Sequence, residues 1–368
     1  MITAHADHVG SLLRPRQLLD ARAELAAGDL APADFKRIED SGVRHVVALQ
    51  EDSGMPVITD GELRRESFQS ELTASCRGFS GVSIDAWLWG DWHSEDQGDL
   101  SVERPPELAV TEPLRKVRSL AAEELAFLRG ITDRVAKITL PSPSLFANLW
   151  SPELSREAYP TLDDFLADVA EIMCDEVREL ARLGGTYVQI DAPHYPLLVE
   201  ARWRAFYESR GWSTDAWLSK GIELDNQVIA AAPDVTFGFH LCRGNQGSRW
   251  LVSGEYGPIA AQVLGGIHAH RLLLEYDDER SGGFEPLAHV RDDAMVMLGL
   301  VTTKSGRVET TQDLRARVAD ASAFVALERL GVSTQCGFST STVGNAVTEE
   351  DERRKLGMLA DLAEAVWG

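Results

Sequence analysis

The chain has 368 residues, of which 44% are hydrophobic, enough to bury a large core as one α/β barrel or as two smaller domains. Its net charge of −22 at pH 7 argues against nucleic-acid and membrane-surface partners, because phosphate backbones and anionic lipids repel an acidic protein. The first residues lack a signal-peptide pattern, and no apolar stretch is long enough to cross a bilayer. Four cysteines in so long a chain are more often reduced or metal-bound than paired. Together these observations indicate a cytoplasmic protein.

Short strand-like runs alternate with amphipathic helical patterns along the chain. The predicted strands are Val9–Ser11, Val57–Asp60, Ala136–Leu140, Tyr187–Asp191, Val235–Leu241, Arg271–Glu275, Val296–Thr302 and Val332–Gln335. The clearest helical patterns, with apolar residues three and four positions apart, are Leu162–Leu183, Leu314–Leu330 and Glu349–Val366. Continuous apolar strands that alternate with helices are typical of parallel βα units. Eight such units predict a single (β/α)8 TIM barrel over residues 1–368.

One segment after the second predicted strand interrupts this alternation. Residues 75–113 contain Trp87, Trp89, Trp92, many acidic residues and a Pro-Pro pair at 105–106. We interpret this excursion as a hairpin or a lid, whose aromatic side chains could cover a ligand. The more ordinary interpretation is a small satellite core beneath a long loop.

Reactive side chains stand at the carboxyl ends of five predicted strands. They are Asp60 and Glu62 after the second strand, Asp191 after the fourth, His240 and Cys242 after the fifth, Glu275 after the sixth and Cys336 after the eighth. In a (β/α)8 barrel these ends meet at one face, where the chemistry of such enzymes is found. Chance would place one or two polar groups there, so five converging ends indicate a functional site.

The strongest element is the pair His240-x-Cys242, because residues two apart on a strand point to the same side. Cys336 follows the last strand, which closes the barrel next to the first. An imidazole and two thiolates form a typical zinc set, and three protein ligands leave a fourth position for water or substrate. The alternative is a hydrogen-bonded histidine with two inert buried thiols. Cys76 and Cys174 are assigned to no site.

Seven segments, in order, resemble the catalytic barrel of cobalamin-independent methionine synthase, and in particular its short single-barrel relatives. They are HVGSLLRP (8–15), ITDGELRRESF (58–68), YVQIDAPHY (187–195), FGFHLCRGN (237–245), LLLEYDDERSGGFEPL (272–287), LGLVTTKSGRVE (298–309) and STQCGFSTS (333–341). The resemblance runs nearly from end to end. It implies a zinc-dependent transfer of an alkyl group, such as methyl, to a thiol such as homocysteine.

The resemblance also implies roles for individual residues. By position, the family's zinc ligands correspond to His240, Cys242, Cys336 and, as a carboxylate ligand, Glu275. The groups that hold the amino-acid part of homocysteine correspond to Ser11, Glu62 and Asp191. Two carboxylates can pair with an ammonium group. The structural alternative for the two acids is a helix N-cap or a salt bridge to Arg64 or Arg65.

The sequence departs from the long enzymes in three ways. It has no second, N-terminal barrel, Ala192 follows Asp191 where an acidic residue is frequent, and Lys304 stands where the long enzymes carry a histidine thought to supply a proton. Lys304 is therefore a candidate proton donor, with a solvated lysine at the barrel rim as the alternative.

These departures leave the alkyl donor open. Related zinc barrels open epoxides with coenzyme M, and others take methyl groups from corrinoids. Thiol addition to an epoxide and a corrinoid protein as partner are therefore open alternatives. A third alternative is a non-catalytic zinc-binding relative. Coenzyme M carries no ammonium group for Glu62 and Asp191, so an amino thiol is preferred. We expect polyglutamylated methylfolate to be a poor donor for so acidic a lone barrel. Association into a homo-oligomer stays open.

Overall fold

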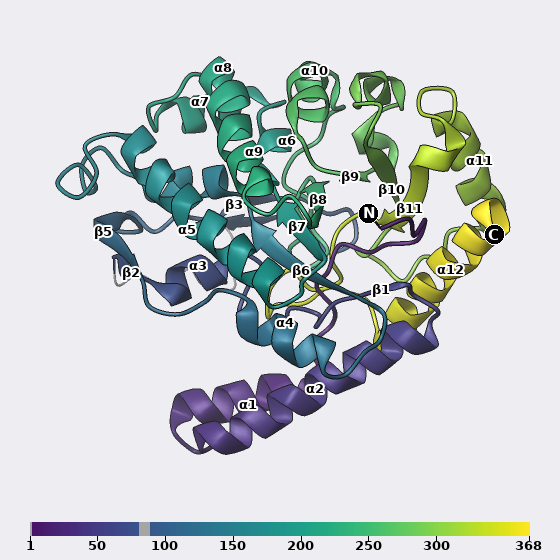
Figure 1. Cartoon of the computed structure of the whole chain (residues 1–368), viewed down its shortest axis with the longest axis horizontal. Coiled ribbons are helices and arrows are strands. Elements are labelled where there is room, and N and C mark those ends of the chain that lie inside the picture. Colours follow the sequence, from purple (N-terminus) through teal and green to yellow (C-terminus); the bar gives the residue numbers. More distant parts are fainter. Residues whose placement is uncertain (1, 81–88) are drawn as a thin grey trace.

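The computed structural model describes residues 2–80 and 89–368, and its centre is a curled parallel sheet (Figure 1). The strands, in spatial order, are β1 (Val57–Ile58), β6 (Val135–Pro141), β7 (Tyr187–Asp191), β8 (Thr236–Leu241), β9 (Arg271–Glu275), β10 (Met295–Val301) and β11 (Leu330–Thr334). Every neighbouring pair is parallel. The (β/α)8 barrel class expected from the sequence is confirmed.

The eighth position of the barrel is filled by the N-terminal segment. The backbone of Asp7 donates to the carbonyl of Val332 over 3.0 Å, and a parallel bridge joins Ala6 to Val332. On the other side Leu12 donates to the carbonyl of Gly61 over 3.0 Å. The prediction of a regular strand at Val9–Ser11 is wrong. The N–H of Val9 binds the Thr334 hydroxyl at 3.2 Å instead of a backbone carbonyl, so the ladder is interrupted there.

Helices surround the sheet, and most of them lie on its outer face (Figure 1). They are α1 (Arg16–Ala27), α2 (Pro32–Asp52), α3 (Ser70–Ser75), α4 (Ala122–Arg129), α5 (Leu162–Arg182), α6 (His194–Leu197), α7 (Ala201–Glu208), α8 (Thr214–Ala216), α9 (Ile222–Ala230), α10 (Gly257–Gly266), α11 (Thr311–Ala321) and α12 (Glu349–Trp367). Capping boxes at Thr161 and Thr348 fix the starts of the two long helices that the sequence predicts best. No helix in the described ranges is long and apolar enough to span a bilayer.

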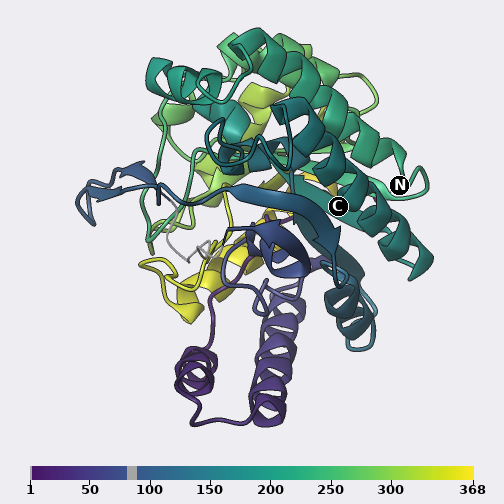
Figure 2. The ribbon, with the colours of Figure 1, turned by 90° about the vertical axis from the view of Figure 1, so that its left-hand side faces the viewer.

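Two findings concern the helices: two of them extend beyond the barrel, and one ends earlier than the sequence predicts. Helices α1 and α2 extend from it as a hairpin (Figure 2). The helix predicted over Leu314–Leu330 ends at Ala321. Val325 is buried in the connection that follows, and Leu330 already begins β11. The apolar pattern therefore runs on through a turn and into a strand.

The excursion after β1 forms two antiparallel strand pairs. Strand β2 (Cys76–Phe79) pairs with β5 (Val110–Lys116), and β3 (Gly90–Trp92) pairs with β4 (Leu100–Val102). Trp92 is buried, and Trp89 packs against Trp203 with 5.5 Å between ring centroids. Trp87 lies outside the described residues.

A buried ionic cluster anchors the N-terminal segment at the opposite end of the barrel from the predicted site. The carboxylate of Asp7 lies 2.8 Å from the Lys137 ammonium and 3.4 Å from the Arg271 guanidinium, and it accepts from the Tyr187 hydroxyl at 2.7 Å. These three partners stand near the amino ends of β6, β9 and β7. Because four chain segments meet there, the cluster fixes the path by which Ser11 reaches the opposite end.

Candidate metal centre and substrate pocket

The parallel register brings the predicted residues to one end of the barrel. Asp191 pairs with His240 across β7 and β8, and Glu275 is the last residue of β9. Cys242 follows the end of β8, and Cys336 follows β11. Since all carboxyl ends of these strands point the same way, their side chains converge as expected.

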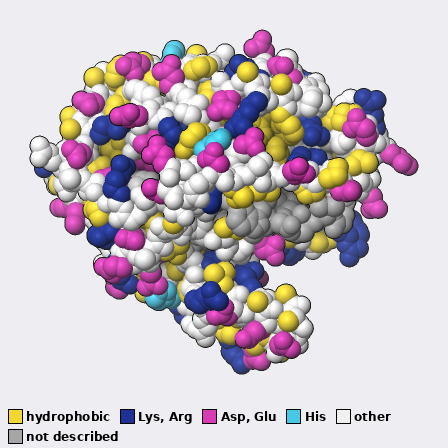
Figure 3. Space-filling view, turned by 180° about the vertical axis from the view of Figure 1, so that it is seen from behind, with side chains coloured by type: hydrophobic (Ala, Val, Ile, Leu, Met, Phe, Trp, Pro, Cys, Tyr) yellow, Lys and Arg dark blue, Asp and Glu magenta, His cyan; other side chains and the backbone are white. Residues whose placement is uncertain are grey.

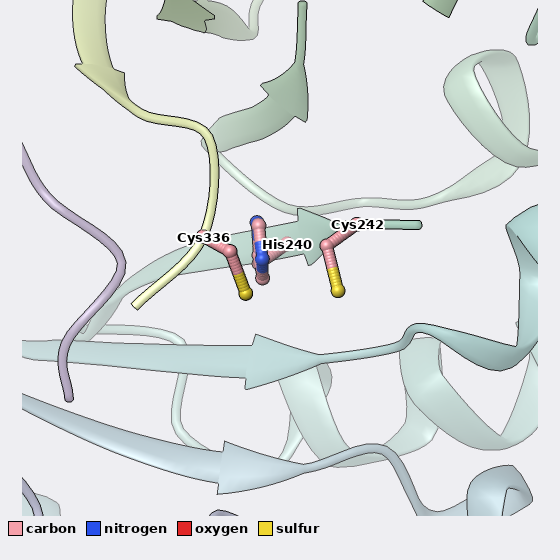
Figure 4. Close-up of side chains that lie close together, drawn as sticks. All are labelled: His240, Cys242 and Cys336. Carbon is pink, nitrogen blue, oxygen red and sulfur yellow. The ribbon is translucent and has the colours of Figure 1, made fainter. Parts of the chain in front are cut away.

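The donor atoms of His240, Cys242 and Cys336 all lie within 4.8 Å of one another, and the three residues are buried. Figure 4 shows His240 and Cys242 extending from β8, with both sulfur atoms on the same side of the group. Nδ1 of His240 lies 3.2 Å from the Leu273 carbonyl, which can only accept, so Nδ1 carries the hydrogen. Nε2 is buried and has no hydrogen-bond partner among the described residues.

The chemistry of these donors fits a zinc ion. A bare imidazole nitrogen beside two thiols is a soft N/S donor set, and the hydrogen bond from Nδ1 to a carbonyl is the usual way in which a metal-binding histidine is oriented. The two thiols are linked by a hydrogen bond. This hydrogen bond holds the pKa of Cys242 well below its usual range and raises the pKa of Cys336. One of the two sulfurs is therefore predisposed to be a thiolate.

Glu275 lies next to this group but is engaged elsewhere. One carboxylate oxygen accepts from the backbone N–H of Arg243 at 2.6 Å, and the other lies 3.2 Å from the Lys304 ammonium. Burial raises the pKa of Glu275, but Lys304 and Arg243 outweigh it and hold that pKa below its ordinary value. Within the described residues, the cluster of donors within 4.8 Å of one another comprises only the histidine and the two cysteines.

Lys304 is not the solvated rim lysine of the alternative interpretation. Its side chain is 11% exposed, and its ammonium lies 3.2 Å from Glu275 and 3.6 Å from Asp277. Burial lowers the pKa of Lys304, but the two carboxylates raise it above its ordinary value. Neither Lys304 nor Glu275 is among the described residues that line the cavity.

Ser11, Glu62 and Asp191 line one cavity together with the histidine and the two cysteines. Oε1 of Glu62 accepts from the Thr139 hydroxyl at 2.7 Å, whereas its buried Oε2 has no hydrogen-bond partner among the described residues. Glu62 has a φ of 58°, a conformation that costs energy for a residue with a side chain.

Asp191 is also buried, and one of its oxygens accepts from Gln189 at 2.8 Å. Burial raises the pKa of Asp191 to about 7. The N-cap residue of the following helix is Pro193, so Asp191 is not a helix cap.

The salt-bridge alternative for Glu62 is also weak. Arg65 reaches Glu62 only at 4.0 Å, while its Nε donates to Glu124 at 2.9 Å. Among the described residues Glu62 forms only this long ion pair, and Asp191 forms none.

The remainder of the cavity wall is mainly apolar and aromatic, and the space enclosed is about 840 Å³, part of it open to solvent. Sequence reasoning missed most of this wall, which includes Leu145, His194, Leu197, Trp203, Tyr207 and Leu251. These residues lie in the connections after β6, β7 and β8, most of them on short helices, which are too short for periodicity to show which side chains turn inward. Trp89 and Trp92 of the excursion also line the cavity.

Comparison with known proteins decides the family. A family model described as the catalytic domain of cobalamin-independent synthase matches residues 1–356. The chain belongs to this cobalamin-independent synthase family. The family resemblance drawn from the seven sequence segments is therefore confirmed, and the chain is related to methyltransferases of methionine synthesis.

Individual relatives agree with this family assignment. The protein YxjH of Bacillus subtilis, an uncharacterized protein, is 32% identical over 366 residues, which cover 98% of this chain and 94% of that one. The methionine synthase of Pyrococcus abyssi is 25% identical over 338 residues, covering 89% and 84%. In fold, the solved structure of a B12-independent methionine synthase from Shewanella sp. W3-18-1 matches with a TM-score of 0.75 at 20% identity, covering 99% and 98%.

Proposed function

We propose that this chain is a zinc-dependent methyltransferase that moves a methyl group from a donor to the sulfur of homocysteine or a similar amino thiol. One observation carries the proposal. The unpartnered Nε2 of His240 and the two thiols open into the same cavity as the unpartnered Oε2 of Glu62 and the carboxylate of Asp191. An amino thiol carries its sulfur and its ammonium group on different carbon atoms, so the sulfur would bind at the donor set and the ammonium group at the two carboxylates.

At the metal end, His240, Cys242 and Cys336 would hold zinc. Zinc bound there supplies Lewis acidity, which lowers the pKa of a thiol that joins the donor set and so makes it nucleophilic at neutral pH. Glu275 is the proposed fourth ligand. As a hard oxygen donor among sulfurs it is the ligand most readily exchanged. Its hydrogen bond from Arg243 and its ion pair with Lys304 give it a stable position when it is not bound to metal.

At the other end, Glu62 and Asp191 would bind the ammonium group, with Ser11 beside them. Burial leaves both carboxylates poorly solvated, so an ammonium that accompanies them into the cavity restores their charge balance. This fixes one end of the acceptor while its sulfur is held at the other. The sulfur is then positioned for attack on the methyl carbon without a search through orientations.

The position of Lys304 favours a positioning role over the proton donation suggested by the sequence. Its ammonium is paired with Glu275 and Asp277, and Lys304 is not among the described residues that line the cavity. It would keep Glu275 ionised and pointed towards the donor set. A proton for the leaving group would then come from elsewhere.

The test is to supply the purified protein with homocysteine and, separately, with methyl-folate, a methyl-corrinoid and a small epoxide, and to follow loss of the free thiol together with zinc content. Methionine formed from homocysteine and either methyl donor supports the proposal. Turnover of coenzyme M with the epoxide, without homocysteine turnover, would favour the addition reaction instead. Zinc retention with no thiol bound at all would indicate a non-catalytic relative.

A further inference from the structure

The part of the cavity away from the two carboxylates has no positive charge in its described lining. It consists mainly of apolar and aromatic side chains, among them Leu145, Leu197, Trp203, Tyr207 and Leu251. An anionic group bound here would find no counter-charge, so this subsite suits an uncharged group.

One polar side chain interrupts this apolar wall. His194, the first residue of α6, lines the cavity and is buried. Its Nε2 lies 2.8 Å from the Ser144 hydroxyl, whereas Nδ1 is buried without a hydrogen-bond partner in the described part of the chain. Burial lowers the pKa of His194 to about 3, so the ring is neutral and Nδ1 is either a bare acceptor or an N–H donor.

A chain of hydrogen bonds decides between these two states. The carboxylate of Asp225, on α9, accepts from the Ser142 hydroxyl at 2.6 Å and from the Tyr195 hydroxyl at 2.7 Å. Ser142 and Ser144 are 3.0 Å apart. Ser144 also lies 3.4 Å from the Tyr195 hydroxyl, a longer contact, and Tyr195 gives its own hydrogen to Asp225. Because Ser142 gives its hydrogen to the ionised Asp225, a hydrogen bond between the two serines takes its hydrogen from Ser144.

Ser144 then has no hydrogen left for His194. The 2.8 Å contact between them is satisfied only if Nε2 of His194 carries the hydrogen and donates it to Ser144. Nδ1 is therefore a bare acceptor when Asp225 is ionised. When Asp225 carries a proton on Oδ1, the oxygen that faces Ser142, the hydrogen bonds through Ser142 and Ser144 reverse and Nδ1 of His194 carries a hydrogen, while Tyr195 still donates to Oδ2. Burial raises the pKa of Asp225 to about 7, so both states are accessible.

We propose that this wall is a second binding subsite, which takes an uncharged aromatic or apolar group that bears an N–H or O–H, and that Nδ1 of His194 accepts this hydrogen bond. The Ser144–Ser142–Asp225 chain is a positioning device that sets the tautomer of His194. The identification of this group as part of the methyl donor rests on the proposed function. The subsite itself does not, since it is defined by its own contacts.

Phenol and fluorobenzene test the subsite, because they are of nearly equal size and only phenol donates a hydrogen bond. Their dissociation constants are measured by NMR titration of 15N-labelled protein at pH 8.5, where Asp225 is ionised, and the 15N shifts of His194 report its tautomer. We expect phenol to shift the His194 signals and to bind more tightly than fluorobenzene. Replacement His194→Phe should reduce this preference by roughly three- to tenfold, the value of one hydrogen bond.

Two further measurements do not require the His194→Phe variant to fold. Asp225→Asn with its amide nitrogen on the Ser142 side donates to Ser142 and so reverses the chain, and a proton on Oδ1 of Asp225 in the parent protein at pH 5.5 does the same. Both should show a hydrogen on Nδ1 and a reduced preference for phenol. Asp191, which lines the same cavity and has its pKa raised by burial to about 7, also changes protonation between pH 8.5 and pH 5.5, so the variant measured at pH 8.5 is the arm that isolates the chain. Tyr207→Phe is the matched control, since it removes a hydroxyl from the same wall but belongs to no part of the chain, and it should leave the preference unchanged.

An Nδ1–H tautomer in the parent at pH 8.5, or a phenol preference that is equal in the parent at both pH values and in Asp225→Asn, would overturn the proposal. So would phenol binding that leaves the His194 signals unmoved. None of these measurements requires methyl transfer, so an inactive protein with the expected phenol preference would contradict the proposed function and not the subsite.

Discussion

Gly337 lies directly against Ser11, so that a β-carbon on Gly337 would come within 1.9 Å of the Ser11 hydroxyl oxygen. The next residue, Phe338, donates its backbone N–H to the Ser11 carbonyl at 2.9 Å. The loop that carries Cys336 is therefore seated on the N-terminal segment, and the metal end and the acceptor end of the cavity share one close backbone contact.

Gly337→Ala should consequently damage the metal site. The added methyl group forces the loop away from Ser11 and displaces Cys336, so we expect zinc affinity to fall at least tenfold and the free energy of unfolding to fall by about 1–3 kcal/mol. Zinc titration against a chelator and urea unfolding measure the two effects. Gly357→Ala is the control. A β-carbon there meets nothing within 4 Å, and alanine in a helix should stabilise by about 0.5–1 kcal/mol. Equal zinc affinity in both variants would contradict this account.

Cys242→Ser should lose most of the zinc that the parent protein carries. A serine hydroxyl is a much harder and less acidic ligand than a thiol, so the soft donor set is broken although the side chain keeps its shape. Metal analysis of the purified proteins provides the measurement, with Cys174→Ser as the matched control. Cys174 is buried on α5, where its thiol contacts the Gln227 carbonyl at 3.6 Å, away from the site. Full zinc content in Cys242→Ser would refute the ligand assignment.

Glu62→Gln should weaken binding of the amino thiol while leaving zinc in place. The amide keeps the hydrogen bond from Thr139 but removes the charge that pairs with the ammonium, so we expect homocysteine to bind roughly 10- to 100-fold more weakly. Calorimetric titration with homocysteine, alongside metal analysis, separates the two effects. The same substitution at the exposed Glu66 is the control. If Glu62→Gln binds homocysteine as the parent does, the acceptor is another molecule.

The buried cluster around Asp7 should make stability depend on pH in the acid range. Burial raises the pKa of Asp7, but Lys137 and Arg271 outweigh it and lower that pKa from 3.8 to about 2. A carboxyl group whose pKa is lower in the folded state stabilises the protein above its unfolded value, and this stabilisation is lost as the pH falls from about 4 towards 2. The contribution is on the order of 2 kcal/mol.

Asp7→Asn removes this contribution and leaves two buried cations without their partner. We expect the variant to lose about 3–5 kcal/mol at pH 7, and the difference from the parent to shrink as the pH approaches 2. Urea unfolding between pH 7 and pH 2 measures it, with the exposed Asp133→Asn as control. A difference that stays constant over this range would show that Asp7 does not titrate as described.

The barrel strands were predictable where burial alone determines them. Tyr187–Asp191 and Arg271–Glu275 have the predicted bounds, because apolar runs in parallel strands stop abruptly at polar residues. Val9–Ser11 was not predictable, since the side chain of Thr334, more than 300 positions away, takes the place of a backbone partner. A helical period could not reveal that Leu330 begins a strand.

At the site, too, features set by the order of the strands were predictable, and features set by distant side chains were not. The rule that strand ends converge was enough to bring His240, Cys242 and Cys336 together, because it needs only the order of the strands. The engagement of Glu275 by Lys304 and Arg243 depends on where two other connections lead their side chains. His194 was missed because the partners that set its tautomer come from two other segments, one with residues 142 and 144 and one with residue 225. No local sequence pattern marks such a chain of hydrogen bonds.

Methylfolate with several glutamates should be a poor methyl donor for this protein. Each added glutamate brings another carboxylate, and among the described residues that line the cavity none is Lys or Arg. On the face shown in Figure 3, basic side chains are scattered among acidic ones rather than gathered into a patch. With a net charge of −22, the long-range field also repels a polyanion.

We therefore expect kcat/KM with methylfolate to fall, or at best to stay level, as the number of glutamates rises from one to three, and to rise with salt, which screens the repulsion. A methyl-corrinoid is the comparison donor, with the rate of methionine formation from homocysteine as the readout for each. Since the donors share the acceptor, the metal and the attacking sulfur, a difference between them reports on donor recognition alone. A kcat/KM that increases with each glutamate would contradict the charge argument and would leave the zinc and acceptor assignments unaffected.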